Sequence, residues 1–541
     1  MSAGTTRLQG RVSRTAVLGL LILGATGCGG GGGGSSGGIG GGGGGGGTNT
    51  GTWQAGVFQP SSSFQNHCAV PRTGTDPFTG RAYPDLTGTV TDQNNWLRSW
   101  TNELYLWYRE VPDLNPASYQ TDAYFKLLKT SATTASGTDK DHFHFTYPTA
   151  VWDALSTQGQ EVSYGLTFAL TSTAIPRHAF VAYLEPSPPA ATVSSGISRG
   201  AEILTVDGVD LVNVNTQAGV DTLNAGLFPD TAGENHSFGI REQNGTTRTV
   251  TLTSATFTST PVQNVKVINA GGIPVGYMQF NDHIATAEGQ LIQAINTLKN
   301  AAVGDLVLDI RYNGGGYLDI AAELAYMIAG PSRTAGSTFE LQQFNDRYTN
   351  TNPVTGQALT PTQFWSTTRG IQPGLASGQA LPTLNLPRVF VLTGGNTCSA
   401  SEAIINGLRG VGIDVIQIGS RTCGKPYGFY DFDNCGTTYF SIQFRGVNAQ
   451  NFGDYTDGFT PNNSTSNVGF KLPGCSVADD FSHELGDPNE GRFAAALAYR
   501  NTSSCAGPAT GIVKPMAVDV EVPTDVIVPK TPFLENRIMR R

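Results

Sequence analysis

The chain has 541 residues, with 33 basic and 42 acidic side chains and a formal net charge of −9. Charged residues make up only 14% of the sequence, which argues against a protein that binds nucleic acid through concentrated Lys and Arg. Hydrophobic residues make up 39%, enough for substantial cores. Beyond the N-terminus no apolar run reaches the roughly 18 residues of a membrane span, so a multi-pass membrane protein is excluded.

Residues 1–28 have the features of an export signal. Arginines precede a short apolar stretch, residues 16–23, as in secretory signals. The stretch ends in Leu-Gly-Ala-Thr-Gly-Cys, which resembles a bacterial lipobox, and the resemblance implies a lipid on Cys28. The alternative is an ordinary signal with an incidental cysteine. The Gly-rich residues 29–52 suit a flexible linker, so we expect a lipid-anchored lipoprotein of the bacterial cell envelope.

Six cysteines remain when Cys28 is set aside. They are Cys68, Cys398, Cys423, Cys435, Cys475 and Cys505. An even number in an exported chain indicates disulfides, but six cysteines allow fifteen pairings and the sequence does not choose among them. None has the CxxC spacing of a structural zinc site, and we expect no metal site of that type.

Residues 53–158 predict a small helical N-terminal region. Aromatic and leucine side chains recur at helical spacing from Trp96 to Tyr108, which predicts an amphipathic helix that ends near Pro112. A second helix is expected around residues 124–128. We expect the aromatic stripe to be core rather than a ligand site. His142 and His144 lie on one face of an expected strand, but without a third ligand they favour structural or surface roles over a metal site.

Residues 159–260 contain short β-rich runs separated by turns, which indicates a small β domain. Residues 196–208 resemble the central stretch of a PDZ domain, although Ala201 stands where that family has Asp. Four residues fall at the place of the family's carboxylate-binding loop: Gly165, Leu166, Thr167 and Phe168. The resemblance implies that backbone N–H groups there bind the C-terminus of a peptide. Thr167 replaces a glycine of the family pattern.

Residues 261–505 predict an α/β core with a largely parallel sheet, because strand-like and helix-like runs alternate. The strand-like runs are 306–310, 389–393, 413–418 and 439–444. The helix-like runs are 287–299, 320–329 and 400–409. The C-terminal tail, residues 506–541, is rich in Pro and Val and is expected to be extended or loosely docked.

Ser399 follows the strand 389–393 and precedes a helix. This location places its hydroxyl at or near a helix N-terminus, where free N–H groups favour developing negative charge. A serine there can act as a nucleophile if a base reaches it. The alternative is purely structural, because Ser399 and Glu402 also have the spacing of a capping box.

Two further segments carry residues suited to the same chemistry. The strand 306–310 runs into Gly314, Gly315 and Gly316, whose backbone can approach a substrate closely. Lys425 follows another buried strand, and a lysine in apolar surroundings loses proton affinity and can serve as a general base. The alternatives are a glycine-rich turn and a solvated surface lysine.

Taken together, these motifs resemble peptidase family S41, the C-terminal processing or tail-specific serine proteases. The family shows DLRxNxGG, then SASE after a strand, then FGK about 25 residues beyond the serine. The matching residues here are 309–316, 399–402 and 424–425. A PDZ domain before the core also matches the family's domain order. The resemblance covers roughly residues 160–500.

The resemblance implies roles for particular residues. Ser399 is the nucleophile, Lys425 is the general base, and Glu402 orients or polarises the lysine. The oxyanion donors are the N–H of Ala400 and that of Gly314 or Gly315. The chain departs from the family pattern at three positions: Cys398, Cys423 and Pro426. We hypothesise that the two cysteines form a disulfide that fixes the dyad.

The sequence therefore predicts an exported serine endopeptidase that cleaves unfolded or tail-exposed polypeptides and needs no cofactor. Two alternatives remain open. The chain can be an inert lipoprotein that binds peptide tails, or a Ser/Lys hydrolase of a non-peptide ester or amide.

Overall fold

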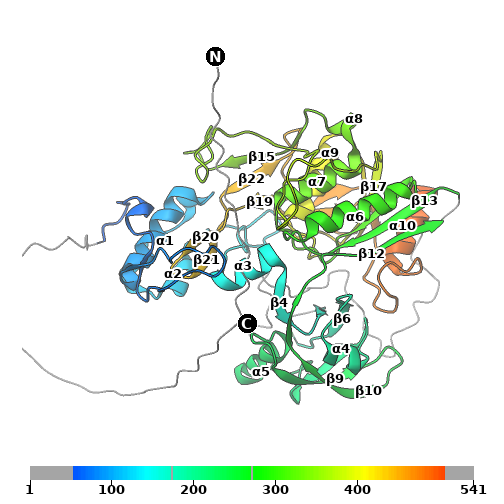
Figure 1. Cartoon of the computed structure of the whole chain (residues 1–541), viewed down its shortest axis with the longest axis horizontal. Helices are drawn as coiled ribbons and strands as arrows, with labels where there is room; N and C mark the ends of the chain where they lie inside the picture. Colours follow the sequence, from blue (N-terminus) through cyan, green and yellow to red (C-terminus); the bar gives the residue numbers. More distant parts are fainter. Residues whose placement is uncertain (1–52, 172–174, 270–271, 506–541) are drawn as a thin grey trace, which may run out of the picture. The chain divides into compact units, whose positions relative to one another are not determined.

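The computed structural model describes residues 53–505 except 172–174 and 270–271 (Figure 1). The predicted export signal with Cys28, the Gly-rich linker and the C-terminal tail lie outside the described residues. Among the helices of the described residues, none combines the length and apolar character that crossing a bilayer requires.

A six-stranded sheet forms the centre of residues 261–505. Its strands lie in the order β12 (Val262–Asn269), β13 (Pro274–Phe280), β14 (Asp305–Asp309), β17 (Arg388–Thr393), β18 (Asp414–Gly419) and β25 (Gly474–Ser476). β12 is antiparallel to β13, and the other four pairs of neighbours are parallel. The prediction of an α/β core with a largely parallel sheet is confirmed.

Helices cover both faces of this sheet (Figure 1). The helices on one face are α6 (Ala287–Asn300), α7 (Leu318–Ala329) and α9 (Ala400–Gly410), and α10 (Gly491–Thr502) packs on the other. Successive side chains of a strand point to opposite faces, so Leu306 and Leu308 pack with the first group while Val307 packs with α10. Burial on both faces explains why these strands are continuous apolar runs.

The single strand predicted at residues 439–444 is wrong. The structure has two strands there, β21 (Thr437–Phe440) and β22 (Phe444–Val447), in separate sheets. β21 pairs with β3 (Phe145–Pro148), and β22 pairs with β15 (Thr338–Phe344). Between them Gln443 bonds to the backbone of Tyr430 in both directions, so the chain leaves one sheet before it joins the next.

Residues 159–260, which the sequence assigns to a PDZ-like domain, are built around a separate β-sheet. This sheet has the order β10 (Thr247–Thr253), β9 (Asn235–Arg241), β7 (Glu202–Val206), β6 (Ala179–Leu184) and β5 (Leu166–Leu170), with β8 (Val209–Asp210) beside β7. Two helices, α4 (Ala190–Ser195) and α5 (Gln217–Leu227), accompany it, and β4 (Gln160–Ser163) pairs with β11 (Ala255–Thr258). The edge strand β5 pairs only with β6 among the described strands.

The region before the PDZ-like domain contains α1 (Val90–Leu104), α2 (Thr121–Leu127) and α3 (Thr149–Gln158). α1 ends at Leu104 rather than near Pro112, because the Leu106 N–H donates to the Ile442 carbonyl instead of continuing the helix. Trp96 and Trp100 are 2% exposed and stack at 5.2 Å, as expected of core side chains.

Three disulfides join the six cysteines of the described residues: Cys68–Cys435, Cys398–Cys423 and Cys475–Cys505. The first, together with the pairing of β3 and β21, attaches the N-terminal region to the core. The remaining short elements are β1 (His67–Cys68), β2 (Leu86–Thr87), α8 (Pro331–Thr334), β16 (Thr362–Gln363), β19 (Tyr427–Gly428), β20 (Phe432–Asn434), β23 (Phe459–Pro461) and β24 (Phe470–Leu472).

Candidate active site

Ser399 lies in a strained turn between β17 and α9. Its φ of 55° falls in the left-handed region, which a residue with a Cβ rarely adopts and which is frequent at functional sites. The Ser399 N–H donates to Glu402 Oε2 at 3.1 Å, so the predicted cap is partly present. The Ala400 N–H, at the first position of the helix, donates to no other described residue. This free N–H and the helix dipole favour negative charge beside the serine.

Lys425 is buried beside the same turn, in the loop that follows β18. The residue is only 3% exposed. Its amine lies 4.2 Å from the ring centroid of Phe429 and 5.0 Å from that of Phe143. Burial lowers the pKa of Lys425 to about 7, while the carboxylates of Asp141 and Glu402 act in the opposite direction. A lysine with this pKa is largely uncharged in weakly alkaline solution, so its amine can accept a proton.

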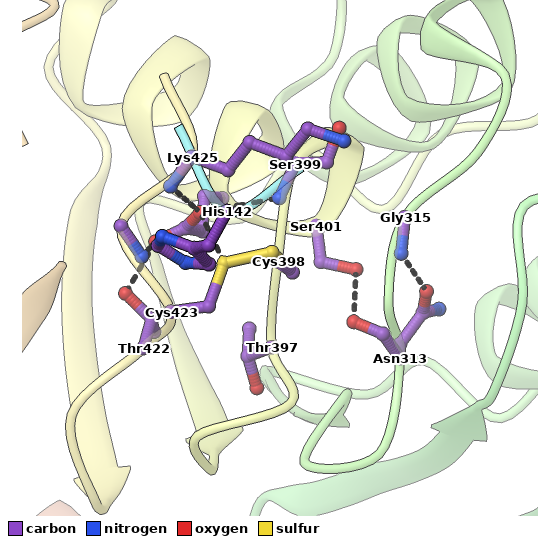
Figure 2. Close-up of a disulfide and its surroundings, with 12 residues drawn as sticks. His142, Asn313, Gly315, Thr397, Cys398, Ser399, Ser401, Thr422, Cys423 and Lys425 are labelled. Atoms are coloured by element: carbon purple, nitrogen blue, oxygen red, sulfur yellow. Dashed lines mark hydrogen bonds between the residues drawn. A yellow bond between two sulfur atoms is a disulfide. The ribbon is translucent and has the colours of Figure 1, made fainter. Parts of the chain in front are cut away.

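The side chains of Ser399 and Lys425 end at the same place in the view of Figure 2. Both line a cavity of about 440 Å³. Neither the hydroxyl nor the amine makes a hydrogen bond to any residue of the described ranges, so both groups remain available to a ligand in the cavity.

Glu402 connects the two segments that carry these side chains. Its carboxylate accepts hydrogen bonds from Thr422 Oγ1 (2.5 Å), the Gly424 N–H (2.9 Å) and the Lys425 N–H (2.8 Å), besides that of Ser399. Burial raises the pKa of Glu402 to about 7, although these bonds lower it. The carboxylate therefore holds the backbone of Lys425, and its charge also acts on the buried amine.

A disulfide links the same two segments, as we hypothesised from the sequence. Cys398 and Cys423 are joined with their Cα atoms 5.2 Å apart, directly before Ser399 and two residues before Lys425 (Figure 2). The disulfide and the Glu402 carboxylate together restrain the distance between the two backbones. Cys398, Glu402 and Cys423 also form a cluster of metal-ligand types, but its two sulfur atoms are bonded to each other.

Gly315 brings the glycine run against the serine. Its φ is 101°, and a Cβ at this position would lie 2.7 Å from Ser399 Cβ and 2.9 Å from the Ala400 nitrogen. Only glycine fits such an approach. The Gly315 N–H donates to Asn313 Oδ1 at 2.9 Å, so it is occupied, whereas the Gly314 N–H bonds to no other residue in the described part of the chain.

Asn313 is a positioning residue that the sequence analysis did not identify. Its carbonyl accepts hydrogen bonds from the Cys398 N–H and the Ser401 hydroxyl, both at 3.1 Å (Figure 2). Its side-chain nitrogen donates to the Phe280 carbonyl at 2.9 Å. It thus ties the glycine run to the serine turn. Its position directly before three glycines is the sequence feature that could have identified it.

The N-terminal region contributes one wall around Lys425, which the sequence analysis also missed. Asp141 accepts hydrogen bonds from the Tyr105 hydroxyl (2.6 Å) and the Phe143 N–H (3.0 Å), and Phe143 covers the Lys425 amine. The two histidines of this stretch are engaged with backbone carbonyls. His142 bonds to Asp139 and His144 to Phe125, each at 2.9 Å.

The predicted carboxylate-binding loop lies in the PDZ-like domain. Leu166, Thr167 and Phe168 begin the edge strand β5 and line a second cavity, of about 730 Å³, together with Leu227 and Phe228. The Gly165 N–H is occupied by Ser163 Oγ at 3.0 Å. The cavity borders the free edge of β5, the geometry that strand addition by a peptide requires.

Known proteins are similar to the α/β core of this chain. The sequence profile of peptidase family S41 matches residues 274–429. A carboxyl-terminal-processing protease of a Picosynechococcus species is 27% identical over 241 residues, which are 44% of this chain and 49% of that protease. The chain therefore matches about half the length of this curated relative.

One solved structure shares the fold. A Bacteroides fragilis protein described as an S41 protease is 23% identical, with a TM-score of 0.54, over 78% of this chain and 98% of its own. The photosystem II D1 C-terminal processing protease is 20% identical, with a TM-score of 0.38, over 72% of this chain and 94% of its own. The resemblance that the motifs carry is confirmed: the S41 profile covers all three motifs, residues 309–316, 399–402 and 424–425.

Proposed function

We propose that the protein is an exported serine endopeptidase in which Ser399 is the nucleophile and Lys425 the general base. The observation that carries this proposal is the pairing of a strained serine with a buried lysine on one cavity wall. Burial lowers the pKa of Lys425 to about 7, the range in which a lysine works as a base. The matches to S41 proteases support peptide hydrolysis as the reaction.

The reaction proceeds through an acyl-enzyme. The neutral Lys425 amine accepts the proton of the Ser399 hydroxyl as Oγ bonds to the peptide carbonyl carbon. The oxyanion is stabilised by the Ala400 N–H and by one N–H of the glycine run, Gly314 or Gly315. Gly314 is favoured, because its N–H is free whereas that of Gly315 donates to Asn313. The C–N bond then breaks, and the leaving amine takes the proton from Lys425. Water hydrolyses the ester and restores both side chains.

Glu402 acts as a positioning residue in this scheme. It bonds to the N–H groups of Ser399 and Lys425, so it sets the separation of nucleophile and base without contact with the amine. The Cys398–Cys423 disulfide acts on the same separation. The proposed reaction uses no metal or cofactor.

Substrate polypeptides are proposed to bind by their C-termini to the PDZ-like domain, at Gly165, Leu166, Thr167 and Phe168. The free edge of β5 and the neighbouring cavity support this role. Cys28, with its lipobox-like context, supports export and a lipid anchor in the bacterial envelope. A chain tethered there would meet unfolded or tail-exposed polypeptides of the envelope.

Cleavage of denatured casein by residues 29–541 tests the activity, with Ser399→Ala as the matched control. We expect cleavage by the parent and none by the variant at equal thermal stability. Binding without cleavage would favour the alternative of an inert receptor for peptide tails. Hydrolysis of a small ester without cleavage of casein would favour a non-peptide hydrolase.

A further inference from the structure

Glu340 is a buried carboxyl group on the wall of the cavity that contains Ser399 and Lys425. It lies on β15 and is 6% exposed. Side chains alternate along the strand, so Glu340 and Gln342 line the cavity while Phe339 packs on the opposite side against α9 at Gly407. The carboxyl group is thus directed to the cavity rather than to the core.

This carboxyl group has no partner within the described residues, where it accepts no hydrogen bond and forms no ion pair. Burial alone raises the pKa of Glu340 to about 8. Most buried polar groups are satisfied, and an unpaired buried carboxyl group destabilises the fold. An unpaired carboxyl group on a cavity wall indicates a ligand that forms its missing hydrogen bonds.

The opposing strand leaves space for this group. Gly446 lies on β22, and a Cβ at that position would overlap the Glu340 carboxyl group. Tyr455 and Ala403 line the adjoining part of the cavity. Ala403 is one helical turn beyond Ser399, so the acidic wall and the serine face one continuous space.

The charge of the cavity favours a cation. Its lining includes three carboxyl groups, those of Asp319, Glu340 and Asp431, against one lysine, Lys425. Asp319 accepts a hydrogen bond from Trp365 Nε1 at 2.8 Å, and Asp431 accepts one from Trp152 Nε1 at 2.6 Å. Glu340 is therefore the group of the three that a bound ligand would satisfy.

We propose that Glu340 determines specificity, by binding the cationic side chain of a substrate Lys or Arg next to the bond that Ser399 attacks. A long apolar stem with a charged end matches a cavity that is aromatic along its walls and carboxylic at Glu340. A charge-assisted hydrogen bond to a desolvated partner discriminates strongly, because a substrate that lacks the donor leaves the buried carboxyl group unpaired. This inference rests on the proposed peptidase activity.

The test compares peptides that differ at one position. Lys, Arg, norleucine or Glu occupies that position, and kcat/KM is measured for each peptide. We expect the parent enzyme to cleave the Lys and Arg peptides at least about tenfold faster than the norleucine peptide. In Glu340→Gln this ratio is expected to fall below about threefold, because the amide has no charge to pair. An unchanged ratio in the variant, or a parent that prefers norleucine, overturns the inference.

Two additions keep the outcomes distinct. Asp414→Asn removes an exposed carboxyl group at the start of β18 and is expected to leave the ratio unchanged, which controls for net charge. Fluorescence anisotropy with the Ser399→Ala protein measures peptide binding without cleavage. There the Lys peptide is expected to bind about tenfold more weakly when Glu340→Gln is added. If the parent enzyme cleaves no peptide but this binding difference is present, the peptidase proposal is refuted and the role of Glu340 is not. If the two proteins bind the Lys peptide equally, the role of Glu340 is refuted.

Discussion

Lowering the pH from 8 to 6 is expected to reduce kcat/KM about tenfold. Burial lowers the pKa of Lys425 to about 7, so the neutral fraction of its amine falls from about 90% at pH 8 to about 10% at pH 6. Above pH 8 the rate should reach a plateau. An ordinary lysine, with a pKa near 10.5, would instead be about 0.3% neutral at pH 8, and the rate would rise tenfold per unit up to about pH 10.

The assay is hydrolysis of one quenched fluorescent peptide at constant ionic strength between pH 5 and 10. Because burial also raises the pKa of Glu402 to about 7, the same profile is measured for Glu402→Gln. The variant is expected to have a lower kcat and to keep the acid limb, moved to lower pH, because the Glu402 carboxylate also raises the pKa of Lys425. A rate that still climbs above pH 8, or a flat profile from pH 5 to 8, would refute the assignment of Lys425 as a perturbed base. Disappearance of the limb in Glu402→Gln would assign it to Glu402.

Three further predictions concern the groups around the dyad. Cys398→Ala/Cys423→Ala is expected to lower kcat about 3–10-fold and the free energy of unfolding by about 3 kcal/mol, measured by peptide hydrolysis and urea denaturation, because it frees the serine and lysine segments. Gly315→Ala is expected to abolish measurable kcat, because its Cβ would lie 2.7 Å from Ser399 Cβ. Asp141→Asn should move the acid limb of kcat/KM to lower pH, because the Asp141 carboxylate raises the pKa of the buried amine.

Each of these predictions has an outcome that contradicts it. Cys475→Ser/Cys505→Ser removes a disulfide far from the dyad in sequence, and a loss of kcat equal to that of the first pair would show a general effect on folding. Activity retained by Gly315→Ala would show that the glycine run does not stabilise the oxyanion. A limb that moves to higher pH in Asp141→Asn would contradict the stated electrostatic effect.

Local sequence patterns were sufficient for the residues that lie at the ends of strands and helices. Ser399 and Lys425 follow buried strands, and the structure has β17 and β18 there. Parallel neighbours bring such strand ends to one edge, which is why segments 25 residues apart meet at a disulfide. The hydrogen bonds of Glu402 to backbone N–H groups, by contrast, depend on loop conformation and have no signature in the sequence.

Contacts between distant segments were not predictable. Phe143 covers the Lys425 amine because β3 pairs with β21, and neither strand's own pattern specifies that partner. The division of residues 439–444 between two sheets follows from the same long-range pairing. In the sequence, Glu340 looks like any polar residue of an alternating strand. Only its burial without a partner among the described residues marks it as a candidate binding group.

The central claim is that Lys425 activates Ser399. The most direct measurement is the rate at which a fluorophosphonate forms an adduct with the protein at pH 8, followed by intact mass and peptide mapping. We expect one adduct, on Ser399, formed at least about a hundredfold more slowly in Lys425→Ala. An adduct on another residue, or an equal rate without the lysine amine, would contradict the account.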